Sequence, residues 1–258
     1  LSELEKILER LAKKGITIWG IDYQWLRQHR SRALAPYLDG DEGNVLVIGD
    51  LHSPYDLDGY LTFCMEQQEL WNCGTILFIG DICDFHSISQ WSKIPEELNT
   101  RWEIALARAR LKDRYATFPK ATVTIWNHDA RPRRTAASAW LLREFIQDAN
   151  TIFQAPATYN FVNEIIIDNV LYTHWTKGTA FKKCITEWMN IVQWHCHNSA
   201  GAQYYRNRQW HVWWMQTWNW IDYEKVAFDY ARELSAQPVL SCGVILNNGK
   251  LPILLPYM

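Results

Sequence analysis

Residues 44–52 read NVLVIGDLH, and residues 75–84 read TILFIGDICD. Each stretch is a short apolar run that continues into acidic or histidine residues. Five apolar runs of this kind occur, at residues 45–48, 75–79, 121–125, 170–173 and 190–193. Segments with a helical pattern lie between or beside them, at residues 57–71, 95–115, 134–149 and 179–188. This alternation predicts an α/β domain, in which layers of strands are covered by helices.

The last third of the chain has a different pattern, which predicts antiparallel strands. Residues 239–246 and 251–255 flank NNGK, a strong hairpin signal, and Asp168-Asn169 separates two further apolar runs. Residues 209–217 predict one more strand. At the other end, residues 1–43 begin with a capping-box helix and finish in the turn-rich DGDEG. We interpret residues 1–43 as an N-terminal extension and residues 44–258 as one domain.

Composition excludes several classes of protein. With 258 residues, 48% of them hydrophobic and 21% charged, the chain can bury a large core, which excludes intrinsic disorder. No apolar stretch is long enough to span a membrane. The net charge of -2 gives no general footprint for sequence-independent DNA binding. Six cysteines without a C-x-x-C pair argue against disulfides and thiolate zinc sites, so we expect a cytoplasmic protein of undetermined oligomeric state.

Residues suited to metal binding follow each of the five apolar runs. The carboxyl ends of strands in an open α/β sheet form a common site, so these side chains are expected to converge. Their oxygen and imidazole donors suit Mn, Fe, Zn or Co, and there are enough of them for two ions. Any one of them alone is a weak signal, since Asp84 is equally a helix cap and His174 an ordinary hydrogen-bonded histidine. The full set is Asp50, His52, Asp81, Asp84, Asn127, His128, Asp129, His174, His195 and His197.

The motifs Gly49-Asp50-x-His52, Gly80-Asp81-x-x-Asp84, Asn127-His128-Asp129, His174 and His195-x-His197 resemble those of the calcineurin-like metallophosphoesterase family. The run from Asn127 to Arg134 further resembles members found in phage and prophage genomes. The resemblance covers residues 44 to 200 and implies two facing mixed β-sheets flanked by helices.

The resemblance also implies a role for each residue. Asp50, His52 and His197 would hold one divalent ion, Asn127, His174 and His195 would hold a second, and Asp81 would bridge both. His128 would be the catalytic histidine, and Asp84 would orient a ligand. The implied activity is hydrolysis of phosphomonoesters or phosphodiesters by a metal-bridging hydroxide, with manganese as the foremost candidate ion and nucleic acid as one candidate substrate.

Two further stretches have a functional and a structural interpretation. Arg131, Arg133 and Arg134 could clamp a substrate phosphate, or they could be the solvated start of a helix. Residues 203–220 interleave basic and aromatic side chains, which could stack single-stranded bases or pack into the core.

Tryptophan stands at three positions where the resembled family usually has glycine, namely Trp126, Trp175 and Trp194. The chain has 15 tryptophans and only 12 glycines, where average usage predicts roughly 18 glycines. One interpretation is a genuine variant whose tryptophan side chains turn outward, or a catalytically impaired member that acts as a binding or scaffold module. Another is a translation artefact, because some bacterial lineages read UGA as glycine and another codon table would print tryptophan. UGG codons at all three positions would exclude the second interpretation.

Overall fold

The computed structural model describes residues 43–89, 99–174, 179–194, 200–208, 211–217, 219–222 and 240–257. Most of the predicted N-terminal extension, residues 1–43, lies outside this part of the chain, as do Trp175, His195 and His197. Within the described residues, no helix is long and apolar enough to cross a membrane.

The larger sheet contains the two stretches quoted first. Among the described residues it has six strands in the order β11-β10-β1-β2-β3-β4. Strands β1 to β4 run parallel, whereas β10 and β11 form an antiparallel hairpin against β1. Asn247, Asn248 and Gly249 make its turn with positive φ angles, as the NNGK signal predicted. The strands are β1 (Val45–Ile48), β2 (Thr75–Ile79), β3 (Ala121–Thr124), β4 (Tyr159–Val162), β10 (Ser241–Leu246) and β11 (Leu251–Pro256).

The smaller sheet has five described strands in the order β5-β6-β7-β9-β8. Strands β6, β7 and β9 are parallel, and β5 and β8 are antiparallel edges. Asp168 and Asn169 form the predicted turn between β5 and β6, with φ angles of 51° and 59°. The strands are β5 (Glu164–Ile167), β6 (Val170–Thr173), β7 (Asn190–Gln193), β8 (Gly201–Arg206) and β9 (His211–Gln216).

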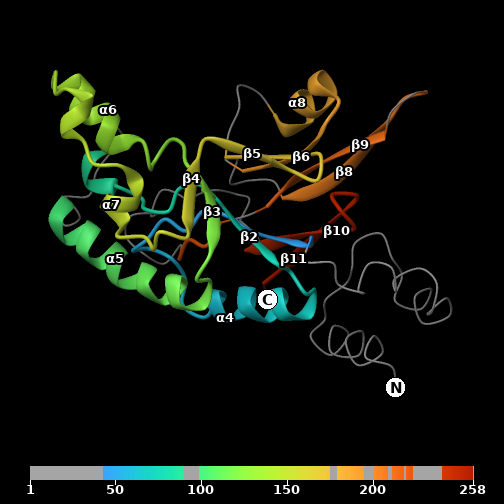
Figure 1. Cartoon of the computed structure of the whole chain (residues 1–258), viewed down its shortest axis with the longest axis horizontal. Helices are drawn as coiled ribbons and strands as arrows, with labels where there is room; N and C mark the ends of the chain where they lie inside the picture. The colour runs from blue at the N-terminus through green and yellow to red at the C-terminus, as the bar shows by residue number, and fades with distance from the viewer. Residues whose placement is uncertain are drawn as a thin grey trace.

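The two sheets lie face to face between layers of helices (Figure 1). Their inner faces share a core that includes Val47, Ile79, Tyr172 and Trp213. Helices α4 (Tyr60–Leu70) and α5 (Thr100–Thr117) cover the outer face of the larger sheet, and α8 (Ala180–Glu187) covers the smaller one. Two facing mixed sheets flanked by helices are therefore confirmed, as are the five predicted strands.

One predicted helix is wrong. Residues 134–149 form no continuous helix but three short elements, α6 (Arg131–Ser138), the 3-10 turn η3 (Arg143–Phe145) and α7 (Ala149–Phe153). Helix α6 stops because Trp140 takes a left-handed φ of 59° and the Leu141 amide donates back to the Ala136 carbonyl at 3.0 Å. This closure ends a helix locally, whatever the apolar spacing beyond it.

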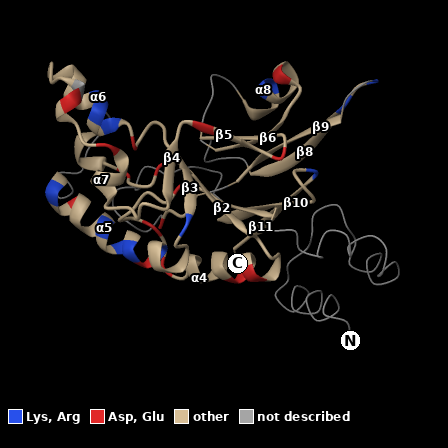
Figure 2. Cartoon of the chain, in the orientation of Figure 1, with Lys and Arg blue, Asp and Glu red and all other residues tan. Residues whose placement is uncertain are grey.

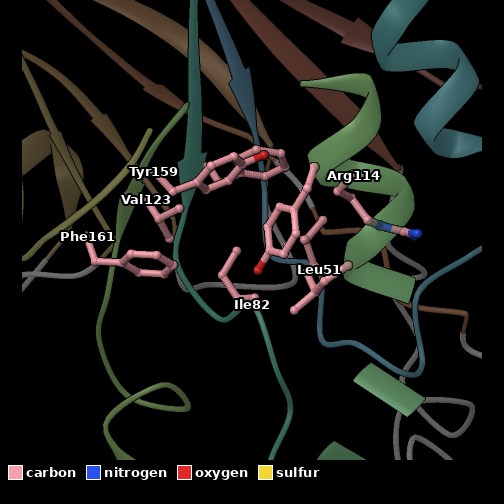
Figure 3. A pocket seen from close by; sticks show the side chains of 9 residues that line it. Leu51, Ile82, Arg114, Val123, Tyr159 and Phe161 are labelled. Atoms are coloured by element: carbon pink, nitrogen blue, oxygen red, sulfur yellow. The ribbon is translucent and has the colours of Figure 1, made fainter. Parts of the chain in front are cut away.

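A small apolar cavity lies in the core between α5 and the larger sheet (Figure 3). Its walls are mostly aliphatic and aromatic, and none of the predicted metal donors lines it. We therefore regard it as a packing feature of the core. The lining residues are Leu51, Phe78, Ile82, Leu111, Arg114, Tyr115, Val123, Tyr159 and Phe161.

Candidate metal centre

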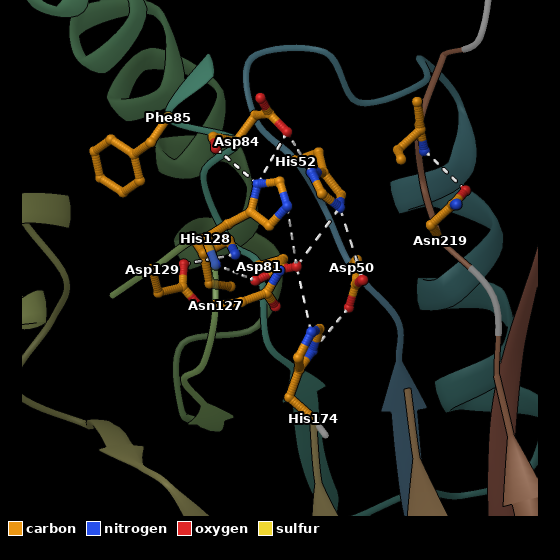
Figure 4. A network of polar contacts seen from close by, with 12 residues as sticks. Asp50, His52, Asp81, Asp84, Phe85, Asn127, His128, Asp129, His174 and Asn219 are labelled. Atoms are coloured by element: carbon orange, nitrogen blue, oxygen red, sulfur yellow. Dashed lines mark hydrogen bonds and ion pairs between the residues drawn. The ribbon is translucent and has the colours of Figure 1, made fainter. Parts of the chain in front are cut away.

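Parallel strands place the predicted donors at one edge of the larger sheet. Strands β1, β2 and β3 are neighbours in register, so the residues that follow them lie side by side. Asp50, Asp81 and Asn127 follow these three strands, and His174 follows β6 of the facing sheet. Figure 4 shows these side chains pointing toward one another.

Asp81 is the centre of the cluster. Its carboxylate Oδ2 lies 3.3 Å from Nε2 of His174, 3.8 Å from Nε2 of His128 and 3.9 Å from Nε2 of His52. Its Oδ1 accepts a hydrogen bond from the His128 amide at 3.0 Å. The side chain is 2% exposed. One buried carboxylate therefore faces three imidazoles.

The donor atoms fit a divalent cation. One donor atom from each of Asp50, His52 and Asp81 lies within 4.8 Å of the others, and the same holds for His52, Asp84 and His128. Two ligands of one tetrahedral ion would lie about 3.4 Å apart. Both carboxylate oxygens of Asp50 and Oδ1 of Asn127 are buried and accept no hydrogen bond from the described residues. Asp50 instead forms ion pairs with neighbouring imidazoles, Oδ1 with Nδ1 of His174 at 3.3 Å and Oδ2 with Nε2 of His52 at 3.7 Å. A cation would satisfy the acceptor capacity that remains on these buried oxygens.

The histidine rings are held so that Nε2 faces the cluster. Nδ1 of His174 lies 3.0 Å from the Ile79 carbonyl, which can only accept, so Nδ1 carries the proton. Nδ1 of His52 lies 2.7 Å from Oδ1 of Asp84. Hydrogen bonds of this kind fix ring orientation in metal sites. Asp84 therefore holds the His52 ring in this orientation.

Gly80 makes room for His174. Its φ is 71°, and an added Cβ would overlap Nδ1 of His174 and lie 2.6 Å from Cγ of the ring. Glycine is therefore required here both by the left-handed backbone and by the close approach of the imidazole.

His128 belongs to the same cluster but has different partners. Its Nδ1 donates to the Asp84 carbonyl at 2.8 Å, and its Nε2 lies 3.1 Å from NH2 of Arg131. NH1 of Arg131 also donates to the Asp84 carbonyl at 2.6 Å. Arg134 donates to the Asn127 carbonyl. The two predicted substrate-binding arginines are thus bonded to the loops that carry the donors.

The charges of the cluster reinforce one another. Burial alone would lower the pKa of His52, but Asp50 and Asp84 raise it to about 10. Burial would likewise raise the pKa of Asp81, yet the histidines around it, His128 first, hold it well below its usual range. Asp129 differs, because burial and the nearby Asp81 raise its pKa to about 7. The buried carboxylates of the cluster are therefore stabilised by neighbouring positive charge, and a divalent cation would supply charge of the same sign.

Two residues in the loops of the cluster have left-handed backbones that their side chains disfavour. They are His52 and Phe85, with φ angles of 49° and 51°, and Asp81 has a φ of 42°, which aspartate tolerates. Residues other than glycine, asparagine and aspartate adopt this region at a cost of order 1–3 kcal/mol each. Such strain gathers at functional sites, where the surrounding structure enforces it.

Two buried carboxylates tie the loops to α5, and sequence analysis missed both. The first is Glu103, whose carboxylate accepts from the His86 amide at 2.7 Å, the Ser87 amide at 3.1 Å and the Ser87 hydroxyl at 2.6 Å. These residues open the 3-10 turn η1 (His86–Ile88), directly after Asp84. A glutamate within a helical pattern carries no sequence signal for this role.

The second anchor is Asp56 in the loop after His52. It accepts from the Ser53 hydroxyl at 2.8 Å and from Nε of Arg110 at 2.9 Å, and it pairs with Arg114. The Trp220 amide reaches the same loop and donates to the Asp50 carbonyl at 2.8 Å. Asn219, beside it, is buried near the cluster (Figure 4).

The tryptophans at expected glycine positions differ in environment. Trp126 is 40% exposed, at the rim of the cluster. Trp194 is fully buried between the two sheets, so its indole does not turn outward. Trp175 lies outside the described residues, together with His195 and His197.

The described residues of the stretch 203–220 include some that pack into the core and others that are exposed. Val212, Trp213 and Met215 of β9 pack into the cores on both sides of the smaller sheet. Tyr204 and His211 are exposed, and their rings stack with centroids 5.4 Å apart. Most aromatic residues of β9 are therefore structural.

Comparisons with known proteins were made for the whole chain. No family model and no curated protein matches it. Among solved structures it is similar to Vps29 from Chaetomium thermophilum, with 10% identity over 82% of this chain and 85% of that one, at a TM-score of 0.42. The nuclease MPE of Pseudomonas putida shows 13% identity over 83% and 87%, at 0.36. The phosphoesterase YfcE from E. coli shows 11% over 78% and 87%, at 0.39. Similarity at this level assigns no activity, so the functional argument rests on the cluster itself.

Proposed function

We propose that the domain over residues 44–258 is a dinuclear metal-dependent phosphoesterase, which hydrolyses phosphomonoesters or phosphodiesters. The observation that carries the proposal is the buried Asp81 carboxylate facing three imidazoles, beside the buried Asp50 carboxylate, which faces His52 and His174. We assign Asp50, His52 and His197 to one ion, Asn127, His174 and His195 to the other, and Asp81 to both. Two bound ions would neutralise the phosphate oxygens and acidify the attacking water.

The protein groups supply orientation and a proton. Asp84 holds His52 through Nδ1, and its carbonyl holds Nδ1 of His128. Nε2 of His128 accepts from Arg131 and therefore carries no proton in this arrangement. Substrate would have to displace the guanidinium, which then becomes available to the phosphate, and Nε2 would have to take up a proton from water before it could pass one to the leaving-group oxygen.

The test is hydrolysis of p-nitrophenyl phosphate and of its bis ester with added Mn²⁺. Asp81→Asn and His128→Ala should each lose most of the activity, and EDTA should abolish it. Asp58→Asn and His211→Ala are matched controls, since both side chains are exposed and lie outside the cluster. Full activity in EDTA, or in both cluster variants, would defeat the proposal.

The tryptophans enter the same experiment. A variant with glycine at 126, 175 and 194 is assayed beside the printed chain. Turnover by both would show that the tryptophans are tolerated, and turnover by the glycine variant alone would show that they block the site. Metal binding without turnover in either chain would select the scaffold alternative.

A further inference from the structure

Four large hydrophobic side chains are exposed together after helix α6. The exposed fractions are 93% for Trp140, 54% for Leu141, 58% for Leu142 and 72% for Phe145. Neighbouring exposed apolar groups of this size mark interaction sites on soluble proteins. We call residues 131–145 the α6 arm.

The α6 arm is strongly basic in a chain whose net charge is -2. Its sequence has arginine at 131, 133, 134 and 143, and Glu144 is its one acidic residue. Figure 2 colours part of the α6 ribbon blue, at positions of lysine or arginine. Arg133 is exposed, and no ion pair or hydrogen bond joins its side chain to the described residues. The arm therefore offers cations and apolar rings on one short segment, a combination that complements a polyanion with flat apolar groups.

The α6 arm starts at the metal centre. The Arg131 amide donates to the His128 carbonyl at 2.8 Å, and the Arg131 side chain contacts His128 and Asp84. Helix α6 has eight residues, so it is about 12 Å long. The exposed rings thus lie about one helix length from the donors, along a path that carries Arg133 and Arg134.

We propose that the α6 arm binds single-stranded nucleic acid, with backbone phosphates on Arg133 and Arg134 and unpaired bases stacked on Phe145 and Trp140. Such a strand would bring a phosphodiester to the metal centre, so the inference rests on the proposed function and adds the substrate class. Exposed aromatic rings stack on the faces of unpaired bases, which a duplex hides. The arginines of α6, which precede the rings, favour a polyanion over a second copy of this basic arm, which would repel it.

The test measures binding without turnover. A fluorescein-labelled dT12 oligonucleotide is titrated with the full chain in EDTA, and anisotropy reports the affinity. Phe145→Ala should weaken binding by about 5- to 100-fold, since it removes one stacking partner. Arg133→Ala should lower the slope of log affinity against log salt by about 0.7, the value for one phosphate contact on a single strand. Both side chains are exposed, so melting temperatures should not change.

Matched control variants test whether binding depends on the α6 arm. Tyr204→Ala and Lys182→Ala remove an exposed ring and an exposed cation from the smaller sheet and its helix, and should leave the affinity unchanged. Trp140 is left out of the primary test because its φ of 59° favours glycine.

The inference would be overturned if the parent chain did not bind the oligonucleotide, or if Tyr204→Ala lost affinity and Phe145→Ala did not. It would also be overturned if the chain bound duplex DNA more tightly than the single strand, or if it formed a dimer that Phe145→Ala dissociates. Hydrolysis of the bis ester with Mn²⁺ reports separately on the proposed function, so the two failures are distinguishable.

Discussion

Gly80→Ala should damage both the fold and the metal centre. An alanine at φ 71° lowers the free energy of unfolding by about 1–2 kcal/mol through backbone strain. About 0.4–1 kcal/mol of this is offset, because alanine reduces the conformational entropy of the unfolded chain. The new methyl also overlaps the His174 ring, which must move and lose its bond from Nδ1 to the Ile79 carbonyl. Losing that buried bond costs about 1–3 kcal/mol. The sum is a destabilisation of about 1–4 kcal/mol, set against a typical total stability of about 5–15 kcal/mol.

Urea unfolding in EDTA measures the free energy of unfolding, and calorimetric titration with Mn²⁺ measures the affinity. We expect affinity to fall by about 10- to 100-fold, because His174 no longer presents Nε2. Gly201→Ala is the matched control, since its φ is not left-handed and no atom lies within 4 Å of an added Cβ. It should change stability by less than about 1 kcal/mol. A Gly80→Ala protein with parental stability and metal affinity would refute the reasoning.

Three further predictions concern the same region. Asp84→Asn should reduce Mn²⁺ affinity by about 10- to 100-fold in calorimetric titration, because it weakens the hold on Nδ1 of His52; an unchanged affinity would contradict that role. The metal-free protein should lose stability as pH rises from about 6.5 to about 10, because the raised pKa of His52 means that folding favours its charged form, which is lost over this range. Urea unfolding midpoints in EDTA at pH 7.5 and 9.5 measure the loss. His52→Gln should make the midpoint less dependent on pH. Trp194→Gly should lower the free energy of unfolding by about 3–5 kcal/mol in urea, since the indole is fully buried. Trp126→Gly, at a 40% exposed position, should lower it by less than about 1 kcal/mol. A Trp194→Gly protein as stable as the printed chain would instead favour glycine as the encoded residue.

Local pattern was enough to predict the strands and the donors that follow them. The runs at 45–48 and 75–79 are continuous in apolar residues because both faces of these strands are buried. Asp50 and Asp81 follow directly, so their convergence depends only on β1 and β2 pairing in parallel.

The missed features depend on contacts between distant segments. Glu103 lies 17 residues from His86, and Arg110 lies 54 residues from Asp56, so no short spacing reveals either anchor. The break after α6 depends on the backbone of Trp140, a residue with no turn propensity of its own. Strand β4 was missed because its sequence, YNFV, has an asparagine inside it and so forms no apolar run.

Helix α5 has a consequence beyond holding two loops. Through Glu103 and through the pair of arginines on Asp56, it fixes the donor loops by contacts that include no metal ligand. In small zinc domains the ion itself orders the chain, and removing it unfolds the protein. Here these contacts order the loops during folding, so under the proposed function an ion could leave and return while the loops keep their places. One divalent metal could then replace another without unfolding the domain.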